Sequence, residues 1–256
     1  MRSLSFILLL CLTSCGTTTA PVKDCPRPSS EAAASCVAID ADLLDDPGPL
    51  DALRLWGHRS KFWPNGETLT VRFLTGTGFQ QDRAWQRFQA IDALAGITFE
   101  RVCAGPSDIR VDFRPGSGHW SYLGTDARTI AQHGATMNLA LTTQDPSDEW
   151  DRVALHEILH ALGFSHEQAH PNHTVPWNEE RVIADYAREQ GWSAAQTRRQ
   201  VLARDDGADF VGSTYDPTSI MHYPISRSHV TDPNAAVGWN RRLTETDKRI
   251  IREVYP

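Results

Sequence analysis

Residues 153–167 read V-A-L-H-E-I-L-H-A-L-G-F-S-H-E and hold three histidines, a glutamate and a glycine at spacings that suit metal chemistry. His156 and His160 are four residues apart, so on a helix both side chains project from one face and can reach a single ion. His166 follows His160 by six residues, a spacing that does not repeat along a straight helix. The helix must therefore end first, and Gly163 permits the turn because glycine enters left-handed backbone conformations without steric cost.

This set of side chains predicts a hydrolytic site with one catalytic Zn²⁺. Zinc in such sites takes three protein ligands and leaves one position for water, whose pKa falls to about 7. Glu157 lies beside the first ligand, where a carboxylate can take the proton of that water as it attacks a carbonyl. A chance match to all five positions is expected at about 10⁻⁴ or less per chain. We therefore predict His156, His160 and His166 as metal ligands and Glu157 as general base.

Other segments resemble one peptidase family. Residues 215–223 read Y-D-P-T-S-I-M-H-Y, residues 63–66 W-P-N-G and residues 120–124 W-S-Y-L-G, and the chain closes on L-T-E-T-D-K-R-I-I-R-E-V-Y before Pro256. With H-E-x-x-H-x-x-G-x-x-H, these stretches resemble the astacin-like zinc peptidases of the metzincin clan. The resemblance runs from about Leu55 to Pro256 and is closest to bacterial members of the family.

The resemblance implies a fold, an activity and two further site residues. It implies an α+β zinc peptidase domain, with a twisted mixed sheet and the active-site helix in the N-terminal subdomain and a mostly irregular or helical C-terminal subdomain. It places Met221 beneath the metal as a hydrophobic floor. It makes Tyr223 a side chain that ligates zinc at rest and swings to hydrogen-bond the tetrahedral intermediate. The implied activity is that of a zinc endopeptidase, which hydrolyses peptide bonds of protein or peptide substrates by metal-activated water.

Length and charge limit the alternatives. The chain has 256 residues and a formal charge of -7, without a basic cluster, so nucleic acid is not expected as a partner. Residues 51–256 suit one catalytic domain, and we expect a monomer. Two other functions stay open: a catalytically inactive domain that holds peptides in its cleft, and a zinc hydrolase of peptidoglycan cross-links. The wall loops of the substrate pocket, such as 226–239, carry no readable preference.

The N-terminus predicts export. Residues 1–14 combine one arginine with a short apolar run, as secretory signals do. Residues 12–15, L-T-S-C, resemble the lipobox of bacterial lipoproteins, in which cleavage leaves a lipid on the cysteine, here Cys15. The alternative is an ordinary signal peptide cut near Ala20. We expect an envelope lipoprotein tethered to a membrane through Cys15, on the periplasmic or cell-surface face.

Residues 15–50 are rich in small and polar side chains and are predicted to be a tether or a short pro-segment. In the second case an acid such as Asp40, or a thiol, would block the zinc. Beyond the leader and Cys15, three cysteines remain, Cys25, Cys36 and Cys103. Cys25 with Cys36 is the simplest disulfide, but sequence leaves the connectivity open.

Alternating and helical patterns predict the elements around the site. Strands are expected at 68–74, 97–102, 108–113 and 136–141. By the resemblance, the last is the sheet edge that pairs with substrate; the alternative is an ordinary buried strand. Residues 116–124 are expected to be a loop carrying a non-ligating His119. Helices are expected at 82–95, capped by Asp82, at 147–162, capped by Ser147 or Asp148, and near 178–189, 193–203 and 244–254, the last with a T-x-x-D capping box.

Two positions depart from the animal members of the family. Their usual R-x-D-R-D after the third ligand is H-P-N-H-T here, residues 170–174. The extra His170 and His173 could compete for the metal, but the glycine spacing favours His166. In the family, the glutamate at Glu167 anchors a processed N-terminus; here we expect it to meet other polar groups.

Overall fold

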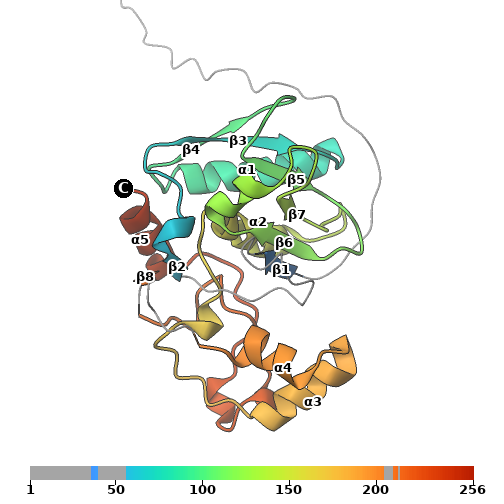
Figure 1. Cartoon of the computed structure of the whole chain (residues 1–256), viewed down its shortest axis with the longest axis vertical. Coiled ribbons are helices and arrows are strands. Elements are labelled where there is room, and N and C mark those ends of the chain that lie inside the picture. Colours follow the sequence, from blue (N-terminus) through green and yellow to red (C-terminus); the bar gives the residue numbers. More distant parts are fainter. Residues whose placement is uncertain (1–35, 40–55, 205–209, 213) are drawn as a thin grey trace, which may run out of the picture.

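The N-terminal half of the protein is built on a mixed sheet (Figure 1). The structure is a computed structural model, and it describes residues 36–39, 56–204, 210–212 and 214–256. The strands of the sheet lie in the order β1-β6-β7-β5-β3-β4. All neighbours are parallel except β6 and β7, which are antiparallel. The strands are β1 (Cys36–Ile39), β3 (Thr68–Phe73), β4 (Thr98–Arg101), β5 (Ile109–Asp112), β6 (His119–Tyr122) and β7 (Met137–Asn138). The predicted strands at 68–74, 97–102 and 108–113 are confirmed.

Two long helices, α1 (Gly78–Asp92) and α2 (Ser147–Ala161), pack with the sheet into one core. On β3, Leu69 and Val71 are fully buried, as the alternating pattern predicts. Phe88 and Ile91 of α1 are buried with them. The predicted start of α1 was wrong: Thr77, not Asp82, caps it through a reciprocal capping box with Gln80. The cap of α2 was also wrong, because Pro146 is its N-cap residue and gives no side-chain bond.

The prediction that residues 136–141 form an edge of the sheet was wrong. β7 lies inside the sheet, between β6 and β5, and covers only Met137 and Asn138. Residues 119–122, expected in a loop, form β6, the antiparallel strand, with alternating burial along H-W-S-Y. The outer side of β6 pairs in parallel with β1, so Cys36 lies opposite His119. β1 also lies against α2.

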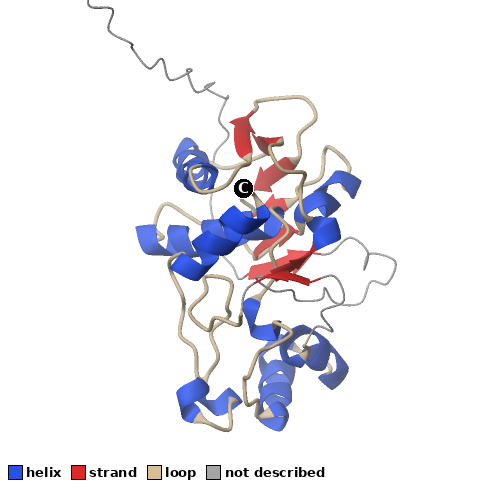
Figure 2. Ribbon diagram, turned by 90° about the vertical axis from the view of Figure 1, so that its left-hand side faces the viewer, coloured by secondary structure: helices blue, strands red, loops and turns tan. Residues whose placement is uncertain are grey.

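The C-terminal half is mostly irregular and helical, and its first two helices lie below the sheet in Figures 1 and 2. It contains α3 (Glu179–Gln190), α4 (Ala194–Thr197) followed by a π-helical turn (Arg198–Leu202), and α5 (Glu245–Val254). A small antiparallel pair joins β2 (Trp56–His58) and β8 (Phe210–Gly212). Short 3-10 turns lie at Arg59–Lys61, Gly124–Thr129, Glu167–Ala169, Arg227–His229 and Pro233–Ala235. The three predicted helices and the Thr244–Asp247 capping box are confirmed.

The end of the chain returns to the N-terminal half. In Figure 1, α5 lies beside β2, far from α3 and α4. The Gly96 amide donates to the Tyr255 carbonyl at 2.7 Å, and the Tyr255 hydroxyl donates to the Leu162 carbonyl at 2.5 Å. The last helix therefore supports the segment that follows α2.

The predicted leader, Cys15 and Cys25 lie outside the described residues, as does most of 15–50 apart from β1. Among the helices that the structure describes, none has the length and apolar composition needed to cross a membrane.

Candidate active site

The three predicted ligands come together. Their Nε2 atoms form a near-equilateral triangle, with sides of 3.1 Å (His156–His160), 3.0 Å (His160–His166) and 3.1 Å (His156–His166). All three side chains are buried. Among the described residues, they form the one group of at least three potential metal ligands whose donor atoms converge.

The turn that delivers His166 depends on Gly163. α2 ends at Ala161, and Gly163 adopts φ +99° while its amide donates to the His160 carbonyl at 2.7 Å. A Cβ atom at this position would lie 2.9 Å from the Lys61 carbonyl oxygen and 2.9 Å from Phe62. Glycine is therefore required both for the left-handed conformation and for the close approach of the 61–62 segment.

The orientation of the imidazoles fits a bound cation. His156 Nδ1 donates to the Ile220 carbonyl at 3.0 Å and His160 Nδ1 to the Phe164 carbonyl at 2.7 Å. With the proton on Nδ1, the Nε2 lone pairs of both rings point into the triangle. Lone pairs this close repel one another unless a cation lies among them. Ligand nitrogens 2.0 to 2.1 Å from a tetrahedral zinc are about 3.3 Å apart, close to the separations seen here.

Burial keeps the two helical ligands neutral. It lowers the pKa of His160 to about 4. It also lowers the pKa of His156 well below its usual value, and the neighbouring His160 adds to that effect. Neutral imidazole is the form that binds a metal, so the site is ready for Zn²⁺ near pH 7 without first losing protons.

Glu157 and Met221 are buried, and Tyr223 packs against two of the ligand rings. Glu157 is fully buried and adjoins His156 on α2. Met221 is also fully buried. The Tyr223 ring lies 4.1 Å from the His166 ring, centroid to centroid, and stacks on His156 at 5.9 Å. Of the two residues with a predicted part in the chemistry, Glu157 thus follows a ligand directly on α2, and Tyr223 contacts two ligand rings.

The segment after the third ligand is fastened to the loop that carries Met221. The Glu167 amide donates to the Met221 carbonyl at 3.2 Å, and Glu167 Oε1 accepts from the Asp216 amide at 2.7 Å. Gln168 Oε1 accepts from the Tyr223 amide at 3.1 Å. Glu167 therefore meets a backbone group, as expected. Burial raises the pKa of its carboxyl to about 9.

The other histidines of the region have structural roles. His170 and His173 are buried, and their Nδ1 atoms accept from the Asn172 and Val175 amides at 3.0 and 3.2 Å. Neither belongs to the metal-binding group, so the choice of His166 is confirmed. His119 Nδ1 accepts from the Ala140 amide at 3.0 Å, which joins β6 to the segment after β7.

Asp247 makes hydrogen bonds to the Met221 loop that the sequence did not predict. Besides capping α5, its carboxylate accepts from the Ser219 hydroxyl at 2.6 Å and from the Ile220 amide at 3.2 Å. The Ile220 carbonyl in turn orients His156. The T-x-x-D motif revealed only the cap, because contacts 27 and 28 residues away have no local pattern.

Arg152 is a second residue that sequence reasoning passed over. It lies one helical turn before His156, and its guanidinium lies 4.3 Å from the centre of the Trp239 ring. It is also paired with Glu149 at 2.5 Å.

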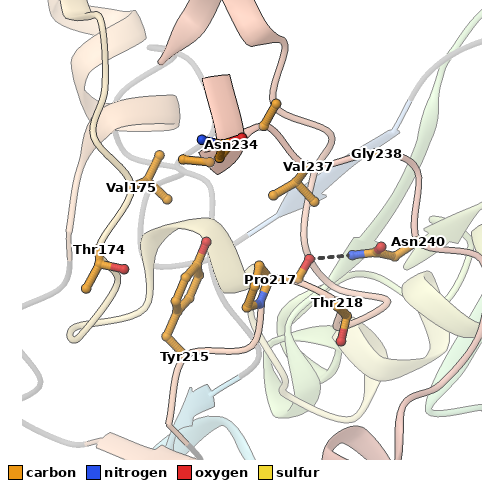
Figure 3. A pocket seen from close by; sticks show the side chains of 11 residues that line it. Thr174, Val175, Tyr215, Pro217, Thr218, Asn234, Val237, Gly238 and Asn240 are labelled. Carbon is orange, nitrogen blue, oxygen red and sulfur yellow. Dashed lines mark hydrogen bonds between the residues drawn. The ribbon is translucent and has the colours of Figure 1, made fainter. Parts of the chain in front are cut away.

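A separate cavity of about 370 Å³ lies in the C-terminal half (Figure 3). Val175, Tyr215, Pro217 and Asn240 are among its lining residues, and Asn240 donates to the Pro217 carbonyl at 2.9 Å. The zinc ligands do not line it, so we assign it no part in the chemistry.

Comparison with known proteins agrees with this geometry. The model of the astacin peptidase family matches residues 57–255. A structure of myroilysin is similar, with a TM-score of 0.76 and 38% identity over 78% of this chain and 98% of that one. High choriolytic enzyme 1, a hatching enzyme zinc-protease of the fish Oryzias latipes, shares the fold, with a TM-score of 0.51 and 20% identity over 75% of this chain and 92% of that one.

Curated relatives include two zinc metalloproteinases of Caenorhabditis elegans. Dpy-31 is 32% identical over 119 residues, which are 40% of this chain and 18% of that protein. Nas-14 is 26% identical over 218 residues, or 80% of this chain and 39% of that protein. The chain thus spans well under half the length of these relatives. Residues 57–255 make this chain a member of the astacin family of zinc metallopeptidases, with His156, His160 and His166 as its zinc site.

Proposed function

We propose that this chain is an active zinc endopeptidase that hydrolyses internal peptide bonds of protein substrates. One observation carries the proposal: three buried imidazoles converge, with Nε2 atoms no more than 3.1 Å apart, on the helix and turn that also carry the buried Glu157. A protein that only bound zinc, or held peptides without cutting them, would not need a buried carboxylate at this position. Protein substrates are supported by the family and by its relatives.

Glu157 acts as the general base in this proposal. Zn²⁺ held by the three Nε2 atoms supplies a Lewis acid that polarises a carbonyl and acidifies a water. Glu157 accepts the proton of the attacking water and passes it to the departing amine. Its complete burial excludes bulk water from the carboxylate, so the proton stays between the reacting groups.

Tyr223 stabilises charge on the substrate. Its ring rests against His166 and His156, so the phenol belongs to the immediate surroundings of the zinc ligands. We propose that the phenol donates a hydrogen bond to the oxyanion that develops on the attacked carbonyl. Such a bond is strongest in the transition state and therefore favours turnover over substrate binding.

The outer edge of β6 is the place for an extended substrate. An edge strand offers unpaired amide and carbonyl groups that bind a peptide main chain largely independent of its sequence. In this structure β1 takes that edge and lies against α2, the helix that carries the catalytic groups. Of the two interpretations of residues 15–50, this pairing supports the pro-segment: β1 excludes substrate until it is displaced.

The N-terminal features complete the proposal. Residues 1–14 act as a signal peptide, and Cys15 receives a lipid that holds the protein at a membrane of the cell envelope. Residues 51–256 form the catalytic domain. The support is the pattern of the sequence itself, a short apolar leader followed by L-T-S-C.

A peptide library tests the activity. The purified protein should cut internal peptide bonds, as mapped by mass spectrometry, and a chelator should abolish the cuts. Glu157→Gln should keep one zinc per chain and lose activity by several orders of magnitude, because the amide cannot accept a proton. Cutting by Glu157→Gln near the wild-type rate would remove Glu157 from its role.

Proline substitutions test the inhibitory strand. Ala38→Pro and Val37→Pro each remove an amide from β1, and only one of these two neighbours directs its amide towards β6. The more disruptive variant should raise activity several-fold over the full-length protein. Ala33→Pro, outside β1, is the matched control and should change nothing. Equal activity in all three variants would leave residues 15–50 as a tether only.

A further inference from the structure

Tyr215 and His222 flank the segment that carries Met221, and a hydrogen bond joins their side chains. The Tyr215 hydroxyl lies 2.9 Å from His222 Nε2, and the His222 ring is buried. The other ring nitrogen, Nδ1, donates to the Tyr223 carbonyl at 2.6 Å, because a carbonyl can only accept. Two hydrogen bonds thus lead from Tyr215 through one imidazole to the main chain of Tyr223.

The direction of the first bond follows from the second. Burial disfavours the charged form of an imidazole, so the His222 ring carries a single proton. That proton is on Nδ1, which leaves Nε2 as an acceptor. Burial also raises the pKa of the Tyr215 phenol, so its hydroxyl keeps its proton and donates to Nε2.

Both polar groups of the Tyr223 main chain are bonded to side chains. Its amide donates to Gln168 Oε1 at 3.1 Å, and its carbonyl accepts from His222. The Tyr223 side chain leaves the main chain between these two groups, so fixing both fixes the point from which the phenol extends. Gln168 supplies one of these bonds directly, and Tyr215 supports the other through His222.

Tyr215 is in turn held by the segment after the third zinc ligand. The amide of the next residue, Asp216, donates to Glu167 Oε1 at 2.7 Å. The Tyr215 ring lies 6.4 Å from the His170 ring and 6.3 Å from the His173 ring, centroid to centroid. Both histidines are buried, and each Nδ1 accepts from an amide two residues further along the chain. The histidines that depart from the pattern of the animal astacins therefore lie beside the ring of Tyr215.

We propose that Tyr215 is a positioning residue for catalysis: its hydroxyl orients His222, and His222 holds the main chain of Tyr223 so that the phenol is directed to the oxyanion. This inference rests on the oxyanion role proposed above for Tyr223. A phenol that extends from a less well held main chain donates in fewer of its orientations. Loss of the Tyr215 hydroxyl should therefore lower turnover and leave zinc binding intact.

Tyr215→Phe removes only the hydroxyl and keeps the ring, which also lines the cavity in Figure 3. It should lower kcat about three- to tenfold, the usual effect of one lost hydrogen bond, with a smaller change in KM and one zinc per chain. Tyr186→Phe, on α3, is the matched control and should keep the wild-type kcat. A wild-type kcat in Tyr215→Phe would overturn the inference.

A double-mutant cycle shows whether Tyr215 acts through Tyr223. In Tyr223→Phe the phenol is already absent, so adding Tyr215→Phe should change kcat by less than about twofold. A general disturbance of the fold would lower kcat equally in both backgrounds, and that result would overturn the inference. If Tyr223→Phe itself keeps the wild-type kcat, the proposed oxyanion role fails and the inference that rests on it fails too.

Nitrogen-15 NMR of the histidine rings in the zinc-loaded protein tests the hydrogen bonds without using the activity. His222 should show a protonated Nδ1 and an Nε2 that accepts a bond, assigned by the loss of both signals in His222→Asn. Tyr215→Phe should shift the Nε2 signal towards that of an unbonded ring nitrogen, and Tyr186→Phe should leave it in place. An Nε2 signal unchanged by Tyr215→Phe would show that the pair does not form in solution, and would overturn the inference whatever the kinetics.

Discussion

Two backbone carbonyl groups, one close to its histidine in the chain and one 64 residues away, orient the metal ligands at the residue level. The Ile220 and Phe164 carbonyls fix the Nδ1 protons of His156 and His160, and burial keeps both rings neutral. The pair needs no proton loss before it binds zinc. What remains for catalysis is a base and a donor to the oxyanion, the roles proposed for Glu157 and Tyr223.

Tyr223→Phe should separate substrate binding from turnover. The phenol is proposed to bond the oxyanion mainly in the transition state, so its loss should lower kcat by roughly 10² to 10³ with a smaller change in KM. Zinc should remain stoichiometric, because the three imidazoles are untouched. Tyr186→Phe, on α3, is the control. An unchanged kcat would mean that Tyr223 only packs against the ligand rings.

His119→Gln should reduce the sensitivity of the fold to acid. Burial, assisted by the charge of Arg152, lowers the pKa of His119 to about 4. As the pH falls from about 6.5 to about 4, the unfolded chain takes up this proton and the folded protein does not, so stability is lost in that window. The loss due to His119 is at most about 3 kcal/mol. The Gln carbonyl can still accept from the Ala140 amide.

Urea unfolding of both proteins at pH 7 and pH 4.5 measures this effect. The wild type should lose more free energy of unfolding than His119→Gln between the two values. Parallel losses would show that His119 contributes nothing to the acid sensitivity.

At the level of elements, the turn after α2 is held by the close approach of the 61–62 segment. A left-handed backbone conformation costs a non-glycine residue roughly 1 to 2 kcal/mol. Gly163→Ala should lower the free energy of unfolding by more than this amount. Its Cβ would also meet the Lys61 carbonyl at 2.9 Å, so the turn and with it His166 must shift. Zinc affinity should fall together with stability.

Gly191→Ala supplies the matched control for this turn. Gly191 has φ +72°, but a Cβ atom added there would have no neighbouring atom within 4 Å, so its substitution adds backbone strain without a clash. Chemical unfolding and zinc titration of both variants measure the difference. Equal losses in the two proteins would show that the contact with Lys61 is not important.

In the whole molecule, the N-terminal segment links the catalytic domain to its proposed location. Cys15→Ala should release the protein from membranes or leave it unprocessed, because a lipobox requires the thiol for lipid attachment. Fractionation of cells and incorporation of labelled fatty acid measure this. Cys25→Ser is the control and should still be lipidated. A wild-type protein that incorporates no labelled fatty acid would contradict the lipoprotein assignment.

Local sequence was sufficient to predict the features that depend on residues close together in the chain. The zinc ligands lie within eleven residues of one another, so helical periodicity and one glycine predict their convergence. The strand patterns and the capping box of α5 are equally local. The start of α1 was predictable in the same way, since Thr77 and Gln80 match a capping box, but a pattern that begins at Asp82 led to the wrong boundary.

Tertiary structure decided everything that depends on which segments meet. Strand order is set by packing and hydrogen bonding between distant residues, so nothing in 136–141 or 119–122 alone shows that β7 is interior and β6 lies outside it. The same holds for the pairing of β1 with β6 and for the hydrogen bond of Asp247 with the Ile220 amide. Sequence specifies the chemistry of these groups, but their partners lie tens of residues away, and only the folded chain brings them together.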